Sequence, residues 1–144
     1  MSPDVIALAR GWLGTPYLHQ GALKGVGCDC AGLVRGVWAE HYGTPFPEVP
    51  IYTPDWFEPQ GEDGLLAIVR RHFGTAPIGP MYHGQLVAFR MRSGAIAKHL
   101  GLVTTDGPGL RFIHAYSGHG VVESPLSAPW RRRIAAQFYF EQGE

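Results

Sequence analysis

The residues best suited to chemistry are two cysteines at the end of a glycine-rich stretch, Cys28 and Cys30. Cys30 follows Asp29, a residue type that caps helix N-termini, so the thiol is predicted in the first turn of a helix. There the helix dipole and unpaired backbone N–H groups favour the thiolate and can stabilise an oxyanion. We therefore expect Cys30 to be a nucleophile with a pKa below the ordinary value of about 8.5. Cys28, in the preceding loop, is expected to be structural.

Two other interpretations of these cysteines remain open, and a third is disfavoured. Both could be small buried core residues, as most free cysteines are. A Cys-x-Cys pair could bind zinc, but the usual spacing is Cys-x2-Cys and no second close pair of ligands follows. A disulfide between residues two apart would be strained. The sequence thus favours no metal and no cofactor.

A thiol nucleophile needs a base, and the base needs an orienting group. His99 and His114 fall on two predicted strands, 98–104 and 110–116, joined by the turn sequence 106–109, so their imidazoles are expected side by side. The chain contains no Asn, which makes His114 the candidate for the orienting role beside His99 as base. The remaining histidines are interpreted as surface or core residues: His19, His41, His72, His83 and His119.

Helices are predicted in the first half of the chain. The first begins with Ser2 as the capping hydroxyl, Pro3 and Asp4, and runs to Gly14. The second runs from Asp29, its N-cap, to Gly43, and the third covers about 62–73 and stops at Gly74.

The second half changes to the period of strands, at 86–89, 98–104, 110–116, 121–123 and 134–140. Helices followed by about five strands predict an α+β fold with the helices on one face of a mainly antiparallel sheet. The proline-rich segment 45–59 is predicted to be a surface excursion. Either the segment folds back and covers the helices, or its aromatic and aliphatic side chains are displayed at the surface: Phe46, Ile51, Tyr52, Trp56 and Phe57.

The composition limits the classes of function that are compatible with this chain. The 144 residues are 45% hydrophobic and 17% charged, which predicts a single globular domain over 1–144. Twelve basic and twelve acidic residues cancel, which argues against nucleic-acid binding, and the run 131–133 is interpreted as a solvated face. No apolar stretch is long enough to span a membrane, and no signal peptide is recognised.

Five sequence blocks in this order resemble the NlpC-type cysteine peptidases of bacterial cell walls, which have a compact papain-like fold. The blocks are Gly14-Thr15-Pro16-Tyr17, Asp29-Cys30-Ala31-Gly32-Leu33, Gly84-Gln85-Leu86, His99-Leu100-Gly101-Leu102 and His114-Ala115. The resemblance implies Cys30 as nucleophile, His99 as base and His114 as orienter. It also implies that Tyr17 and Asp29 contact substrate, with Tyr17 beside the thiol.

The resemblance implies hydrolysis of the γ-D-glutamyl–diaminopimelate bond of peptidoglycan stem peptides. The sequence departs from the family pattern in four places: segment 17–20 lacks the usual Trp, the proline-rich insertion 45–59 is long, and two single residues differ. Ala31 replaces a Ser whose hydroxyl can touch substrate, and Gln85 replaces an Asp with a structural role. Two alternatives to this function remain: a structural tail-hub subunit without activity, and another papain-like amidase or acyltransferase.

The helix segment 34–38, the excursion 45–59 and the segment 129–133 resemble the branch of this family encoded in phage tail clusters and gene-transfer-agent particles. We therefore expect a protein made in the bacterial cytoplasm without a signal peptide and assembled into a phage-like tail. Its expected partners are tail-hub proteins, docked through 45–59 or 130–140, with no nucleic acid and no membrane.

Overall fold

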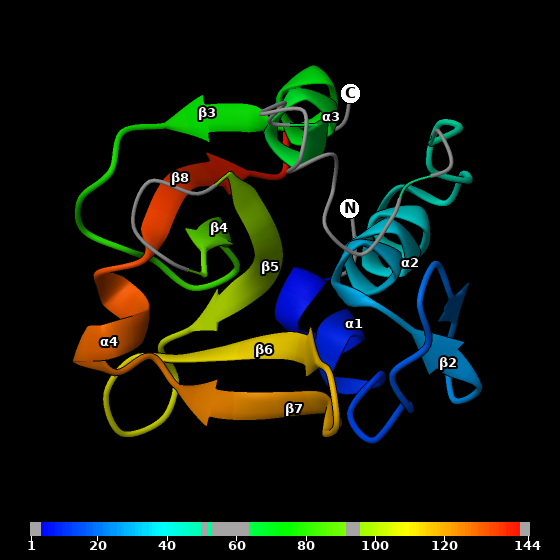
Figure 1. Ribbon diagram of the computed structural model, residues 1–144, viewed down its shortest axis with the longest axis horizontal. Coiled ribbons are helices and arrows are strands. Elements are labelled where there is room, and N and C mark those ends of the chain that lie inside the picture. Colours follow the sequence, from blue (N-terminus) through cyan, green and yellow to red (C-terminus); the bar gives the residue numbers. More distant parts are fainter. Residues whose placement is uncertain (1–3, 50–51, 53–63, 92–95, 142–144) are drawn as a thin grey trace.

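The computed structural model describes residues 4–49, 52, 64–91 and 96–141, and its centre is an antiparallel sheet (Figure 1). Six strands pair in the order β3-β8-β4-β5-β6-β7. Their bounds are Gly74–Ala76 for β3, Leu86–Arg90 for β4, Ala97–Thr104 for β5, Arg111–Tyr116 for β6, Gly120–Pro125 for β7 and Ile134–Tyr139 for β8. Every pair of neighbours is antiparallel, which confirms the predicted α+β class.

Strand β3 was not predicted, because Gly74 was interpreted only as the end of a helix. The chain instead turns directly into a short edge strand in which Gly74 pairs with Tyr139 of β8. A Cβ at Gly74 would lie 2.1 Å from the Tyr139 ring, so the glycine allows this close approach.

The first helix is shorter than the sequence suggested. Helix α1 covers Val5–Arg10, and its N-cap is Asp4, whose carboxylate accepts the backbone N–H of Ile6 at 3.1 Å. The predicted cap, Ser2, lies outside the described residues. The chain leaves the helix at Gly11 and continues through turns, so the prediction that the helix extends to Gly14 is wrong.

The second helix agrees with its prediction at both ends. Helix α2 covers Cys30–Tyr42, and the Asp29 carboxylate accepts the N–H of Gly32 at 2.7 Å. Gly43 ends the helix with a positive φ of 75°, a conformation that glycine adopts readily. Cys30 is therefore the first residue of α2, as expected.

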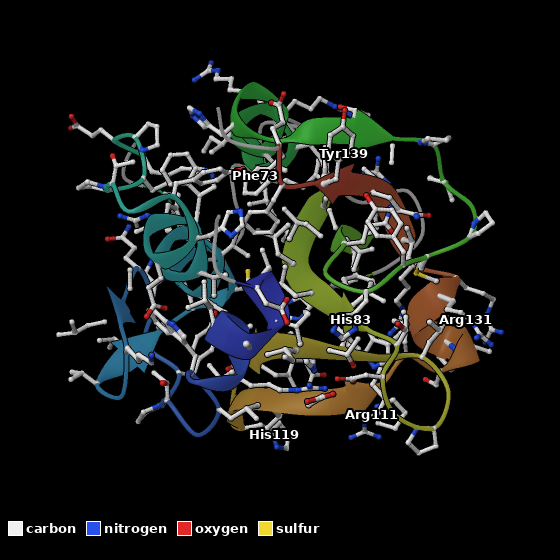
Figure 2. All side chains as sticks on the ribbon, turned by 180° about the vertical axis from the view of Figure 1, so that it is seen from behind. Phe73, His83, Arg111, His119, Arg131 and Tyr139 are labelled. Atoms are coloured by element: carbon white, nitrogen blue, oxygen red, sulfur yellow. The ribbon has the colours of Figure 1, made fainter. Side chains whose placement is uncertain are left out.

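Helix α3, a two-stranded hairpin and helix α4 complete the described part of the fold. Helix α3 covers Gly64–His72, and its predicted start at 62 lies outside the described residues. Within the predicted loop 14–28, the two-residue strands β1 (Ala22–Leu23) and β2 (Gly27–Cys28) form a hairpin beside α2. The short helix α4, Ala128–Arg131, was not predicted. Figure 2 shows Arg131 on α4, and the exposed run 131–133 agrees with the predicted solvated face.

The two faces of the sheet carry different cores. Helices α1, α2 and α3 contact β5 and enclose the larger core, which includes Leu33, Leu66 and Phe138. The other face carries a smaller cluster around Phe89 and Phe112, which Trp130 of α4 helps to cover. Figure 1 shows α1 and α2 on one side of the sheet and α4 on the other.

The prediction of displayed aromatic residues in 45–59 is wrong for the members that the structure describes. Tyr52 is only 4% exposed, and its hydroxyl donates to the Asp29 carboxylate. Phe46 is half-buried against Trp38 and Phe73. Ile51, Trp56 and Phe57 lie outside the described residues. The two described rings pack inward because burying aromatic surface is favourable.

Among the described residues, no helix has both the length and the apolar character needed to cross a bilayer.

Candidate active site

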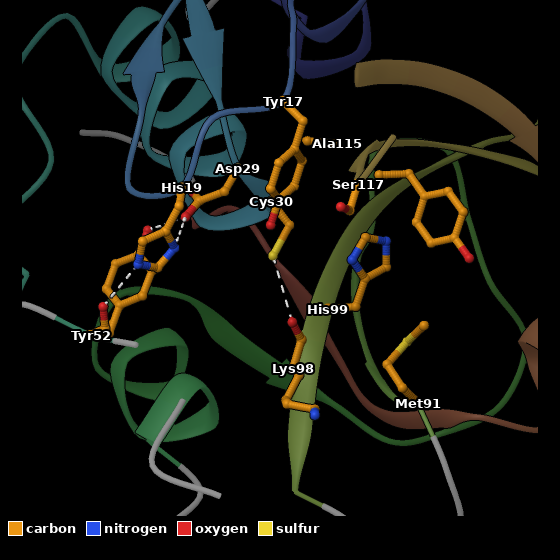
Figure 3. Close-up of a pocket in the computed structure, with 11 residues that line it drawn as sticks. Tyr17, His19, Asp29, Cys30, Tyr52, Met91, Lys98, His99, Ala115 and Ser117 are labelled. Atoms are coloured by element: carbon orange, nitrogen blue, oxygen red, sulfur yellow. Dashed lines mark hydrogen bonds and ion pairs between the residues drawn. The ribbon is translucent and has the colours of Figure 1, made fainter. Parts of the chain in front are cut away.

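A pocket of about 190 Å³ opens where the start of α2 meets the beginning of β5 and the end of β6 (Figure 3). Its walls include both the predicted nucleophile and the predicted base. The lining residues are Tyr17, His19, Asp29, Cys30, Tyr52, Met91, Lys98, His99, Ala115, Tyr116 and Ser117.

Cys30 reaches this pocket from the first turn of α2. The residue is 5% exposed, and Sγ lies 3.7 Å from the carbonyl oxygen of Lys98, to which the thiol donates. The N–H groups of Gly32 and Leu33 are bonded to the side chain and carbonyl of Asp29, whereas those of Cys30 and Ala31 interact with the sulfur. The helix start thus supplies amides beside the thiol, as predicted.

The predicted direction of the Cys30 pKa is wrong. Burial, followed by the negative charge of Asp29, raises the pKa of Cys30 to about 12, although the N–H groups of Leu100, Ala31 and Cys30 act in the opposite direction. Removing a thiolate from water outweighs the short-range help of the amides. In the resting protein Cys30 is therefore a neutral thiol.

His99 and His114 contact each other directly. His99 Nε2 and His114 Nδ1 are 2.7 Å apart, and both rings are buried, with 7% and 1% exposure. Strands β5 and β6 pair through Leu102–Ile113 and Val103–Phe112. Because side chains alternate along a strand, this register places His99 and His114 on the same face of the sheet. The sequence prediction that the turn at 106–109 brings these imidazoles together is confirmed.

Burial also fixes the charge of the histidine pair. Desolvation lowers the pKa of His99 to about 3 and that of His114 to about 4, with His114 and His119 respectively adding repulsion. Both rings are neutral at pH 7. Phe112 stacks on His114 at a centroid distance of 4.0 Å, and Trp130 contacts both histidines. These aromatic rings pack against the histidine pair.

Asp29 organises the opposite wall. Its Oδ2 accepts the N–H of Gln20 at 2.8 Å and the hydroxyl of Tyr52, and its Oδ1 caps α2. The carbonyl of Tyr52 in turn accepts from the Gln20 side chain at 2.6 Å and contacts His19 Nε2 at 3.1 Å. His19, interpreted from sequence as surface or core, thus belongs to the pocket.

Tyr17 stands beside Cys30 in the pocket, with 37% of its surface exposed (Figure 3). Burial and the nearby Cys30 and Asp29 raise the pKa of Tyr17 to about 12, so its hydroxyl remains a hydrogen-bond donor at neutral pH. Cys28 lies in β2, fully buried and outside the pocket lining.

No group of three or more His, Cys, Asp or Glu side chains is placed to hold a metal ion within the described part of the chain.

The sequence missed Tyr52, Trp130 and Ser124 as neighbours of the site. Ser124 Oγ lies 3.0 Å from His114 Nε2. Tyr52 and Ser124 gave no signal, because their roles come from contacts with residues distant in sequence. Ser127 and Pro129, ahead of Trp130, were the available indications of a helix start.

Residues 14–138 match the family described as NlpC/P60. No curated protein gives a significant match.

Three solved structures share the fold. A lipoprotein-like NLP/P60 protein from Staphylococcus aureus is 19% identical with a TM-score of 0.65, and an NlpC/P60 protein from Bacillus cereus is 22% identical with a TM-score of 0.66. The match to the S. aureus protein covers 97% of this chain and 41% of that protein, and the match to the B. cereus protein covers 95% and 40%. The chain therefore spans less than half the length of these two proteins. The NlpC/p60 domain of the peptidoglycan hydrolase SagA is 19% identical with a TM-score of 0.62. The match covers 95% of this chain and 97% of the SagA domain.

Proposed function

The chain belongs to the NlpC/P60 family, and from that membership we propose that it is a cysteine peptidase that hydrolyses an amide bond in peptidoglycan stem peptides. The observation that carries the proposal is one pocket lined by a helix-start thiol and a buried imidazole, with a second imidazole bonded behind it. The SagA domain, named as a peptidoglycan hydrolase, has the same fold over nearly its whole length.

The reaction begins from a neutral thiol and a neutral imidazole. We propose that His99 takes the thiol proton as Sγ of Cys30 attacks the amide carbonyl carbon, forming a tetrahedral oxyanion. The amides of Cys30 and Ala31 and the Tyr17 hydroxyl lie beside the sulfur and are the proposed oxyanion donors.

The intermediate then collapses with loss of the amine, which takes a proton from the His99 imidazolium and leaves a Cys30 thioester. Water, deprotonated by His99, attacks this thioester and releases the acid and the thiol. His114 holds His99 throughout, and no metal is needed for any step. Asp29 and Tyr17 line the same pocket and are the proposed substrate contacts.

The proposed bond is γ-D-glutamyl–diaminopimelate, on the resemblance of the five sequence blocks to the family pattern. Digestion of purified peptidoglycan followed by mass spectrometry of the stem-peptide fragments tests it. New amino termini on diaminopimelate support this bond, and cleavage at another amide, or an acyl-transfer product, would redirect the assignment to another papain-like chemistry.

We further propose that the protein is carried in a phage or gene-transfer-agent tail and helps it penetrate the host wall. This rests on the resemblance of segments 34–38, 45–59 and 129–133 to that branch of the family. Mass spectrometry of purified particles from the producing bacterium tests it: the protein at low copy number beside tail-hub proteins supports carriage, and its absence from every particle contradicts it. The inert-subunit alternative predicts particles that contain the protein but no peptidase activity.

A further inference from the structure

We propose that Ser124 is a positioning residue for the catalytic histidines, which accepts a hydrogen bond from His114 Nε2–H and so favours the tautomers in which His99 Nδ1 is unprotonated. The inference rests on the proposed function, because it concerns the base that Cys30 requires. Ser124 lies on β7, opposite Phe112 of β6, and its side chain shares a face of the sheet with His114. Three neighbouring strands thus contribute one polar side chain each to a continuous chain of hydrogen bonds.

The distances define this chain. Ser124 Oγ is 3.0 Å from His114 Nε2, and His114 Nδ1 is 2.7 Å from His99 Nε2. Phe112 stacks on His114, and Tyr116 and Trp130 contact the same ring. Within the described part of the chain, the hydrogen bonds of the His114 ring are those with His99 and Ser124.

A neutral imidazole has one N–H and one unprotonated nitrogen, so two tautomer patterns fit this chain. In the first, His99 Nε2–H donates to His114 Nδ1, and His114 Nε2–H donates to Ser124. His99 then turns an unprotonated Nδ1 towards Cys30, on the side where Figure 3 shows a ring nitrogen. In the second pattern every proton is on the other nitrogen, and His99 Nδ1 already carries one.

Only the first pattern gives a base, because a protonated Nδ1 cannot accept the thiol proton. A hydroxyl can donate or accept, so Ser124 can satisfy His114 Nε2 in either pattern, and the first pattern, which the proposed base requires, uses it as the acceptor of the buried N–H. Without that oxygen, an N–H at His114 Nε2 would lack a partner, which is unfavourable in a buried site. The proton would then move to Nδ1 and the second pattern would prevail.

Ser124→Ala, with Ser124→Thr as the conservative variant, tests this role. We expect Ser124→Ala to lower kcat on a stem-peptide substrate about 2- to 10-fold, with little change in KM. This is the rate change that corresponds to the free energy of one neutral hydrogen bond. Ser124→Thr retains a hydroxyl and should restore most of the rate. Ser127→Ala is the matched control, because this serine makes no cap hydrogen bond to α4. Thermal unfolding of each variant checks that the fold is kept.

Nitrogen-15 NMR of the histidine rings provides a readout that does not depend on turnover. The wild type should show His99 and His114 as Nε2–H tautomers, and Ser124→Ala should shift both towards Nδ1–H. Unchanged tautomers together with an unchanged kcat in Ser124→Ala would overturn the inference. If the wild type hydrolyses no stem peptide, the proposed function fails, and the NMR comparison still decides the role of Ser124.

Discussion

His99 and His114 share a 2.7 Å hydrogen bond between Nε2 and Nδ1, and each ring is buried in its neutral form. A carboxylate in the position of His114 would instead favour the imidazolium form of His99. The neutral pair explains why a neutral thiol can stand beside the base: one proton moves from Cys30 to His99 only when the substrate is attacked.

The reactivity of Cys30 should therefore rise at high pH. Because burial raises the pKa of this thiol in the folded protein, we expect alkylation by iodoacetamide to increase with an apparent pKa well above 8.5, and thiolate absorbance at 240 nm to be absent at pH 7. Cys30→Ala provides the baseline, since Cys28 is also buried, with its pKa raised to about 12. An apparent pKa below 8 would instead indicate a resting thiolate–imidazolium pair.

The buried histidines should also make folding sensitive to mild acid. Their folded pKa values lie below the unfolded value of about 6.5, so the unfolded chain binds protons that the folded protein excludes. This stability is fully present above pH 6.5 and is lost as the pH falls towards 4. Urea unfolding between pH 5 and 7 measures the slope. A flat profile there would contradict neutral burial of the pair, since the carboxylates of Asp106 and Glu123, with lowered pKa values, titrate below this window.

The sequence predicted the catalytic residues of the pocket but not the contacts that support its opposite wall. Cys30, His99 and His114 were predicted because helix capping and a hairpin turn are local patterns, and the structure brings them together. The Asp29–Tyr52 contact was missed because it joins the N-cap of α2 to a residue 23 positions later, in the proline-rich segment that follows the helix and has no periodicity. The Cys30 pKa was predicted in the wrong direction because the helix start is visible in sequence, whereas the degree of burial is not.

The Asp29–Tyr52 contact gives a third prediction. Tyr52→Phe removes a donor from a buried carboxylate, and a hydrogen bond to a charged group contributes about 1.5–3 kcal/mol, so the free energy of unfolding should fall by that amount. Tyr42→Phe is the control, because its hydroxyl donates to the exposed carbonyl of Glu141 and its loss should lower stability by less than about 1 kcal/mol. Equal losses in the two variants would mean that Tyr52 does not support Asp29.

The glycine at position 32, two residues after Cys30, is required by the close approach of another backbone segment. A Cβ at this position would lie 1.6 Å from the carbonyl oxygen of Gly21, a backbone atom that cannot move without shifting the loop before α2. Gly32→Ala should therefore lower the free energy of unfolding by at least about 2 kcal/mol and disturb the Cys30 amides. Gly107→Ala, at an open position in the hairpin turn, should change stability little. Circular dichroism melts and turnover assays of both variants measure the contrast.

The most direct test of the account is turnover of purified peptidoglycan by Cys30→Ala and Cys28→Ala beside the wild type, followed by mass spectrometry of the released fragments. Removing the nucleophile of a catalytic unit lowers the rate by several powers of ten, so Cys30→Ala should release no stem-peptide fragments while keeping the wild-type fold. Cys28→Ala should keep the activity, because Cys28 lies in β2 outside the pocket lining. An active Cys30→Ala, or an inactive but folded Cys28→Ala, would contradict the assignment of Cys30 as the nucleophile.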